Sequence, residues 1–217
     1  MLAIGQEGLA VQHVLCLGAH GDDIEIGCGG TILKLLEAGA GRISVEWVVF
    51  SAPEGRKPEA TRSAMDFLRE AKETNIVVES FRMSYFPYEG AAIKERFDRL
   101  GERSSPDLIF THHREDLHQD HRLISELTWN TFRNHLILEY EVPKYDGDLG
   151  RPNVFVHLDR QHSDRKVRNL LNHFQSQRDK PWFTEDTFLA IMRLRGIESR
   201  APSGFAEGFH GRKVVLA

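Results

Sequence analysis

The sequence predicts an α/β protein with a Rossmann-like three-layer architecture, in which a mainly parallel sheet carries helices on both faces. Short apolar runs alternate along the chain with longer segments of helical periodicity, which is the pattern of repeated strand–helix units. Turn residues separate the two kinds of segment throughout the chain. Right-handed crossovers are expected for such a sheet.

The first unit shows the pattern most clearly. The run VQHVLCLG (11–18) is continuously apolar and ends in a turn signal, so it predicts a buried strand. A glycine-rich stretch (27–30) leads into a helix expected to begin at about residue 29 and to close at Gly39. The later units repeat this order, and His210 falls in a glycine-flanked segment interpreted as a turn. The expected strands are residues 11–18, 43–50, 75–80, 106–111, 136–140 and 154–158, and the expected helices are residues 29–38, 59–72, 91–101, 121–132, 164–177 and 185–195.

Length and composition indicate a single globular domain of residues 1–217. Hydrophobic residues make up 41% and charged residues 28%, which argues against extended disorder. The formal net charge is −4, so the chain lacks the concentrated positive charge of a nucleic-acid-binding protein. The composition leaves the oligomeric state open and allows a homo-oligomer.

Two features bear on the compartment. No apolar run approaches the roughly 20 residues needed to cross a bilayer, and residues 1–7 lack the basic flank and apolar stretch of a secretion signal. The two cysteines, Cys16 and Cys28, do not make a disulfide framework in a chain of 217 residues. We therefore expect a cytoplasmic protein.

Two polar clusters follow predicted strands. In open α/β sheets ligands bind beyond the carboxyl ends of the strands, where the strand order reverses. The first cluster, AHGDDIE (19–25), follows the first strand, and the second, HREDLHQDH (113–121), follows the fourth. Histidine and carboxylate side chains together are the ligands that zinc prefers, and two carboxylates with different roles suit hydrolytic metal chemistry.

The two clusters resemble the motifs of a known family. AHGDDIEIGCGGTI resembles the AHPDD motif of the PIG-L/LmbE family of de-N-acetylases, with Gly21 in the usual place of proline. THHREDLHQDH matches the second family motif, HxxDxHxDH, at every specified position. The two motifs occur in the family's order, and the strand–helix pattern agrees over nearly the whole chain. The glycine in place of proline loosens the first loop but removes no ligand.

The resemblance implies a role for each motif residue. His20, Asp23 and His121 would bind the metal, which would be Zn²⁺, although Fe²⁺ accepts the same ligand set. Asp22 would be the general base for the attacking water, and His118 would stabilise the oxyanion or protonate the leaving amine. Further roles implied are Asp120 orienting a histidine and Asp116 ordering the loop.

The substrate implied by the resemblance is a small N-acetylated amino sugar or glycoconjugate, from which acetate is released. Arg56 resembles a family position where arginine contacts substrate, and Glu141, which follows the fifth strand, is a candidate for binding sugar hydroxyls. The glycine-rich stretch at 27–30 lacks a full dinucleotide or P-loop fingerprint, so we expect it to serve close helix–strand packing.

Two other classes of function stay open at this point. One is a different single-metal amidohydrolase or a phosphoesterase. A phosphoesterase usually needs more carboxylates or a second ion, and His112, His113 and Asp116 leave room for a second metal site. The other is a non-catalytic sugar-binding module on a Rossmann-like scaffold, which fold alone does not exclude. An ion count for each chain and the loss of hydrolysis in an Asp22→Asn variant separate these from a deacetylase.

Overall fold

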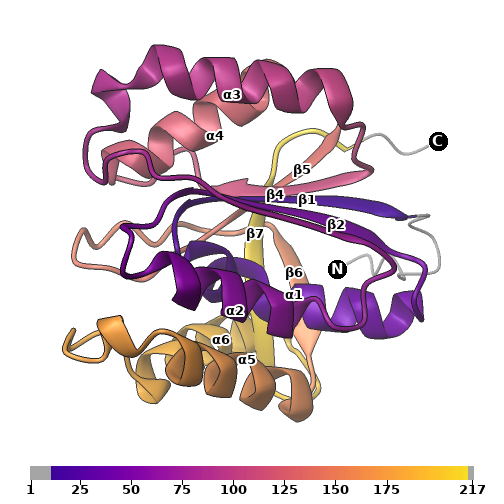
Figure 1. Cartoon of the computed structure of the whole chain (residues 1–217). Helices are drawn as coiled ribbons and strands as arrows, with labels where there is room; N and C mark the ends of the chain where they lie inside the picture. The colour runs from indigo at the N-terminus through magenta and orange to yellow at the C-terminus, as the bar shows by residue number, and fades with distance from the viewer. Residues whose placement is uncertain (1–10, 215–217) are drawn as a thin grey trace.

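The computed structural model describes residues 11–214, which form a seven-stranded sheet with helices on both faces (Figure 1). The strands are β1 (His13–His20), β2 (Ser44–Ser51), β3 (Thr74–Val78), β4 (Leu108–His112), β5 (Leu136–Tyr140), β6 (Val154–Leu158) and β7 (Phe205–Gly211). The helices are α1 (Asp23–Gly39), α2 (Lys57–Phe67), α3 (Gly90–Arg103), α4 (Gln119–Thr131), α5 (Arg160–His173) and α6 (Glu185–Ser199), with short 3₁₀ helices η2 (Phe86–Tyr88) and η3 (Gln175–Gln177). Residues 1–7, from which we expect no secretion signal, lie outside the described range.

Helices α3 and α4 cover one face of the sheet, and α1, α2, α5 and α6 lie on the other (Figure 1). The predicted three-layer α/β fold is therefore confirmed. Within residues 11–214, no helix combines the length and the apolar character needed to traverse a bilayer.

The strand order brings the two polar clusters together. The order across the sheet is β3-β2-β1-β4-β5-β7-β6, and β1 to β5 are parallel. The chain runs outward from β1 to β3 and then returns to the other side of β1, where β4 pairs with it. This reversal makes the carboxyl ends of β1 and β4 neighbours, which is where α/β sheets bind their ligands.

Strand β7 is absent from the sequence prediction. It runs antiparallel between β5 and β6 and pairs His210 with Glu139, so the interpretation of His210 as part of a turn is wrong. Its sequence, FAEGFHG, contains two glycines, which weaken the strand signal. Gly208 is needed there because a Cβ at this position would lie 2.8 Å from the ring of Pro152.

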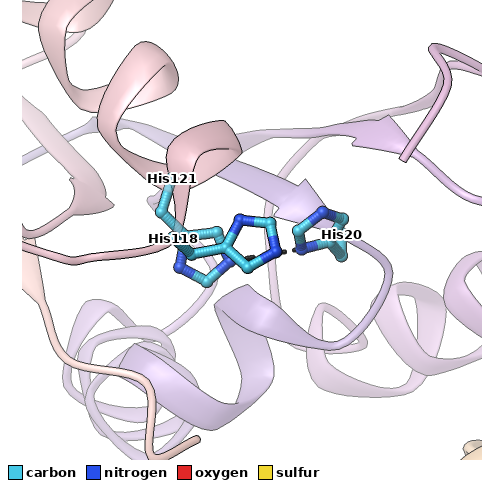
Figure 2. A group of neighbouring side chains, drawn as sticks. All are labelled: His20, His118 and His121. Carbon is cyan, nitrogen blue, oxygen red and sulfur yellow. Dashed lines mark hydrogen bonds between the residues drawn. The ribbon is translucent and has the colours of Figure 1, made fainter. Parts of the chain in front are cut away.

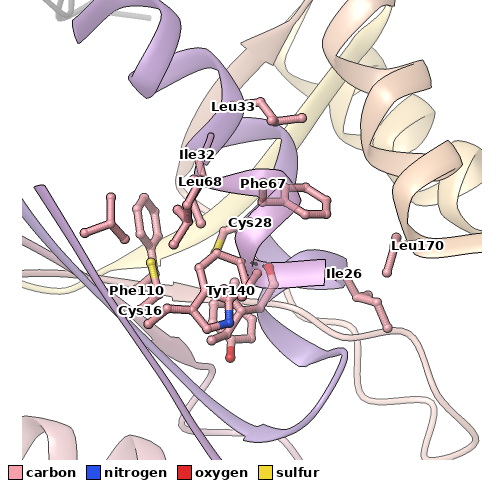
Figure 3. Close-up of a cluster of buried hydrophobic side chains, with 14 of the residues drawn as sticks. Cys16, Ile26, Cys28, Ile32, Leu33, Phe67, Leu68, Phe110, Tyr140 and Leu170 are labelled. Atoms are coloured by element: carbon pink, nitrogen blue, oxygen red, sulfur yellow. Dashed lines mark hydrogen bonds between the residues drawn. The ribbon is translucent and has the colours of Figure 1, made fainter. Parts of the chain in front are cut away.

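Helix α1 begins earlier than predicted, at Asp23 instead of near residue 29. Its first turns are buried on all sides, so they lack the polar face that marks a helix in a sequence. The glycines of the 27–30 stretch allow this burial: a Cβ on Gly27 would lie 2.1 Å from the Tyr140 ring, and one on Gly29 would lie 2.7 Å from Phe67. Figure 3 shows these aromatic rings around the helix. The stretch therefore serves close packing, as predicted.

A buried ion pair holds α1 against the rest of the fold. Lys166 of α5 and Glu207 of β7 lie 2.6 Å apart, and both are almost fully buried. Glu207 accepts the N–H groups of Gly30 and Thr31, and Lys166 donates to the carbonyl of Ile26. Because every charge here has partners, the pair fixes the position of α1 and so of the loop that precedes it.

Candidate metal centre

The two predicted clusters meet at the carboxyl edge of the sheet. His20 is the last residue of β1, and Asp23 is the first residue of α1. His118 and His121 stand at the start of α4 and point toward His20 (Figure 2). Pairs of residues that are about a hundred positions apart in the sequence thus face one another across a few ångströms.

Three atoms converge in this group. His20 Nδ1 lies 3.3 Å from Asp23 Oδ2 and 3.2 Å from His121 Nε2, and His121 Nε2 lies 3.5 Å from Asp23 Oδ2. Ligands at 2.0–2.1 Å from a tetrahedral zinc ion lie about 3.3–3.4 Å from one another. The spacing of the three predicted ligand atoms therefore fits one such ion.

A carboxylate next to each of the two histidines determines which ring nitrogen carries no hydrogen. His20 Nε2 lies 3.0 Å from Asp120 Oδ2, and His121 Nδ1 lies 2.9 Å from Asp116 Oδ2. Both nitrogens donate to these carboxylates, which accept only. In the neutral rings His20 Nδ1 and His121 Nε2 therefore carry lone pairs instead of hydrogens. These two nitrogens face each other and Asp23. Two lone pairs and a carboxylate oxygen at these distances need a cation between them.

The charges of the ion-free group agree with this need. Burial lowers the pKa of His20, but the carboxylates of Asp23 and Asp120 outweigh it and raise the pKa to about 10. Burial, followed by the charge of His112, lowers the pKa of His121 to about 3. His20 therefore carries the added proton when no metal is bound, at the place where a divalent cation would stand.

The supporting carboxylates are themselves anchored by the loops around them. Asp120 is fully buried and accepts the backbone N–H groups of Ser84 and Phe86, at 2.6 and 3.2 Å. Asp116 accepts from Lys144 Nζ at 2.9 Å and from the backbone N–H of His118 at 2.8 Å. Such hydrogen bonds orient metal-binding histidines and raise the affinity of the site.

Asp22 stands beside the converging atoms with a free oxygen. Its side chain is 8% exposed, and Oδ2 has no hydrogen-bond partner within the described chain. Burial, followed by the negative charge of Asp23, raises the pKa of Asp22 to about 6. A buried carboxylate without a partner is costly, so it is retained at functional sites rather than for stability.

His118 uses one ring nitrogen to cap a helix. It is the N-cap of α4, and its Nδ1 accepts the N–H of Asp120 at 3.2 Å. The remaining nitrogen, Nε2, therefore carries a hydrogen whether the ring is neutral or charged. Burial, followed by the charge of His20, lowers the pKa of His118, and its ring lies 4.6 Å from that of His121. His118 is thus a hydrogen-bond donor beside His20 and His121.

His112 lies in the candidate centre, although the sequence suggests it only for a second metal site. It is fully buried at the end of β4, with Nε2 3.3 Å from Asp23 Oδ2. Its Nε2 accepts the N–H of Ala19 at 2.9 Å, so this lone pair is already in use. Two groups of side chains within residues 11–214 have metal-ligand spacing, His20–His118–His121 and Asp23–His112–His121, and they share His121. They therefore overlap in one centre and do not form two separate sites.

The two predicted substrate contacts differ in their surroundings. Arg56 lines a small cavity together with His20 and Asp22, so it borders the cluster. Glu141 instead accepts from the guanidinium of Arg195 at 2.8 and 2.7 Å, and from Gly150 N–H at 2.9 Å. Its carboxylate is 6% exposed and already paired within the chain, and its contact with sugar hydroxyls stays a prediction.

Comparison with known proteins agrees with the two motifs. The family model of PIG-L, described as GlcNAc-PI de-N-acetylase, matches residues 15–132, which include both clusters. The chain belongs to the PIG-L family. The resemblance inferred from the motifs is thereby confirmed, and with it, at the level of the family, the prediction of a deacetylase that hydrolyses amide bonds.

Solved structures of low identity share the fold of this PIG-L chain. The N,N'-diacetylchitobiose deacetylase from Pyrococcus horikoshii is 21% identical, with a TM-score of 0.70 over 94% of this chain and 84% of that one. The 4-carboxy-2-hydroxymuconate hydratase GalB from Pseudomonas putida KT2440 is 16% identical, with a TM-score of 0.70 over 95% and 98%. A teicoplanin deacetylase, in its zinc-inhibited form, is 13% identical, with a TM-score of 0.64 over 92% and 97%. Because a hydratase shares the fold, the reaction must be argued from the site.

Proposed function

We propose that this protein is a zinc-dependent deacetylase that hydrolyses the acetamide of an N-acetylated amino sugar or glycoconjugate. The observation that carries the proposal is the convergence of His20 Nδ1, His121 Nε2 and Asp23 Oδ2 within 3.2–3.5 Å. Two nitrogens and one carboxylate leave a coordination position open, which is typical of catalytic rather than structural zinc sites. Fe²⁺ accepts the same ligands and is the alternative metal.

When bound, the cation polarises the amide carbonyl and lowers the pKa of water toward neutrality. Asp22, which lines a cavity together with His20 and has a free oxygen, takes the proton of the attacking water. His118 donates from Nε2 to the oxygen that becomes negative, because its Nδ1 already accepts from Asp120 N–H. The leaving amine then needs a proton, for which Asp22 and His118 are the two candidate donors. Arg56, which borders the same cavity, is the proposed contact for the substrate's hydroxyl groups.

The small N-acetyl sugar is proposed from the family and from one of the similar structures. The family is described as GlcNAc-PI de-N-acetylase, and the Pyrococcus enzyme acts on N,N'-diacetylchitobiose. The cytoplasm is the proposed compartment, since Cys16 and Cys28 are both buried free thiols, as expected in reducing surroundings.

The test is acetate release from a panel of N-acetylated amino sugars, with the purified protein supplied with zinc or with iron. We expect turnover of at least one sugar, one ion for each chain, and loss of turnover in Asp22→Asn. Two ions for each chain together with hydrolysis of phosphate esters would identify a phosphoesterase instead. Sugar binding without acetate release under either metal would identify a binding module.

A further inference from the structure

A second cavity lies beside the loop that follows β4, and residues 113–115 of that loop line it. It measures about 820 Å³, within the roughly 300–1,000 Å³ usual for small-molecule sites. Three arginines line it, Arg114, Arg151 and Arg212, together with the histidines His113 and His210. None of these residues belongs to the candidate metal centre, and the function proposed above uses none of them.

Two stacked imidazoles line the cavity. The rings of His113 and His210 stack with centroids 3.7 Å apart and planes 13° apart. Gly150 closes over them, because a Cβ at this position would lie 2.9 Å from the His210 ring. His210 Nε2 has no hydrogen-bond partner within residues 11–214, and its nearest carboxylate oxygen, on Glu141, is 3.9 Å away.

The negative charge of Glu139 in this cavity is already balanced. Glu139 is fully buried and pairs with the guanidinium of Arg212. It also accepts from His113 Nδ1 at 3.0 Å and from the backbone N–H of Arg114 at 3.1 Å. The other carboxylate, Glu115, is 88% exposed at the rim, 4.0 Å from His113. Neither acid therefore neutralises the remaining arginines.

Two guanidinium groups stay without a counter-charge. Within residues 11–214, Arg114 and Arg151 are the lining arginines that form no ion pair, whereas Arg212 is held by Glu139 and lies over the Trp129 ring at 4.7 Å. The chain as a whole carries a net charge of −4, so two unpaired arginines in one hollow are a local excess of positive charge. The planar fork of arginine matches carboxylate and phosphate oxygens.

We propose that this cavity is an anion site that binds a small molecule through a carboxylate or phosphate group held by Arg114 and Arg151. The site lies next to the candidate metal centre along the chain. Arg114 lies two residues after His112, which contacts Asp23. It lies two residues before Asp116, which supports His121. The bound anion is either part of the deacetylase substrate or a separate ligand.

Calorimetric titration of the zinc-loaded protein with inorganic phosphate and with succinate tests the site directly and requires no activity. We expect the Arg114→Gln/Arg151→Gln double variant to bind at least one of them about 10- to 100-fold more weakly, as the loss of charge-assisted hydrogen bonds predicts. The control is Arg42→Gln, which removes an exposed arginine that lies before the amino end of β2 and does not line the cavity, and it should leave binding unchanged. Both changed arginines are exposed, so the fold is retained. Binding that the double variant keeps undiminished, or no binding by the wild-type protein at millimolar anion, overturns the proposal.

A kinetic arm identifies the source of the anion, and it rests on the proposed deacetylase function. The KM values for N-acetylglucosamine and for N-acetylglucosamine 6-phosphate are compared in wild type and double variant. A rise in KM for the phosphorylated sugar alone assigns the anion to the substrate. Weaker phosphate binding with both KM values unchanged assigns it to a separate ligand, and both results support the site. If no sugar is deacetylated, the deacetylase proposal fails while the titration still decides the anion site.

Discussion

His121 Nε2 lies 3.2 Å from His20 Nδ1, although the two residues are 101 positions apart in the sequence. Each ring has its other nitrogen against a carboxylate, that of Asp120 for His20 and that of Asp116 for His121. The facing nitrogens therefore have no hydrogen to share in the neutral state. Two facing lone pairs repel each other, so a cation or an added proton must lie between the rings. The predictions that concern the metal depend on this pair of nitrogens.

The first prediction distinguishes the role of His121 as a metal ligand from that of His118 as a hydrogen-bond donor. His121→Ala should abolish both metal content and turnover, because His121 Nε2 is one of the three converging atoms. His118→Ala should keep the metal and lower turnover by about 10²–10⁴-fold, the usual range for loss of an acid or base. Metal analysis and acetate release on both variants decide this. Equal loss of metal from both would show that His118 is a ligand, as its place in the group with His20 and His121 allows.

The second prediction concerns Asp116, which supports His121 from behind. Asp116→Asn should weaken zinc affinity by about 10- to 100-fold, the usual effect of removing such a partner. The control is Asp148→Asn, because Asp148 contacts Lys144, as Asp116 does, but has no contact with His121. Competition with a chelator measures both affinities. A similar loss in the two variants would mean that Lys144, rather than His121, transmits the effect.

The sequence predicts the site better than it predicts the elements that hold it. His20, Asp22, Asp23, His118 and His121 come together as their positions after two strands predict, because parallel strands share one carboxyl edge. The residues of each site motif lie within a few positions of one another, so their spacing in the sequence is enough to identify them. Residues brought in by tertiary contact, such as Ser84 and Phe86 behind Asp120, carry no such signal.

Burial explains most of the remaining differences. His112 resembles any residue at the end of an apolar strand, and only its packing against Asp23 gives it a role. Glu141 stands at the expected edge of the sheet, and its pairing with Arg195, which comes from the distant helix α6, is a tertiary contact that the sequence does not reveal. The start of α1 is wholly buried and so lacks helical periodicity, and β7 contains glycines that hide a strand.

The third prediction tests the packing of α1. Gly27→Ala should destabilise the protein by about 1–3 kcal/mol, because the new Cβ would overlap the Tyr140 ring at 2.1 Å. Tyr140 is held in place by donating to the carbonyl of Leu17 at 2.7 Å, so the overlap outweighs the gain in helix propensity of about 1 kcal/mol.

The matched change in the loop before the helix is Gly21→Ala. A Cβ there would lie 3.4 Å from that of Ala60, an ordinary contact, and Gly21 does not have a positive φ. Gly21→Ala should therefore stabilise the protein by about 0.4–1 kcal/mol, because alanine lowers the conformational entropy of the unfolded chain. Denaturant unfolding measures both variants, and a loss of stability in Gly21→Ala would show that this loop needs glycine.

The last prediction concerns Asp22 and pH. As the proposed base, Asp22 must be ionised, so turnover should fall as the pH drops through its pKa. Burial and Asp23 raise that pKa to about 6, whereas a bound cation favours the carboxylate and lowers it. The acidic limb of the rate profile should therefore lie at or below about pH 6, with full activity above it. In Asp22→Asn the side chain keeps nearly the same shape but accepts no proton, so turnover should fall by about 10²–10⁴-fold. The metal content should not change. Steady-state acetate release across pH checks both points, and near-normal turnover in the variant with the same acidic limb would move the role of base to His118.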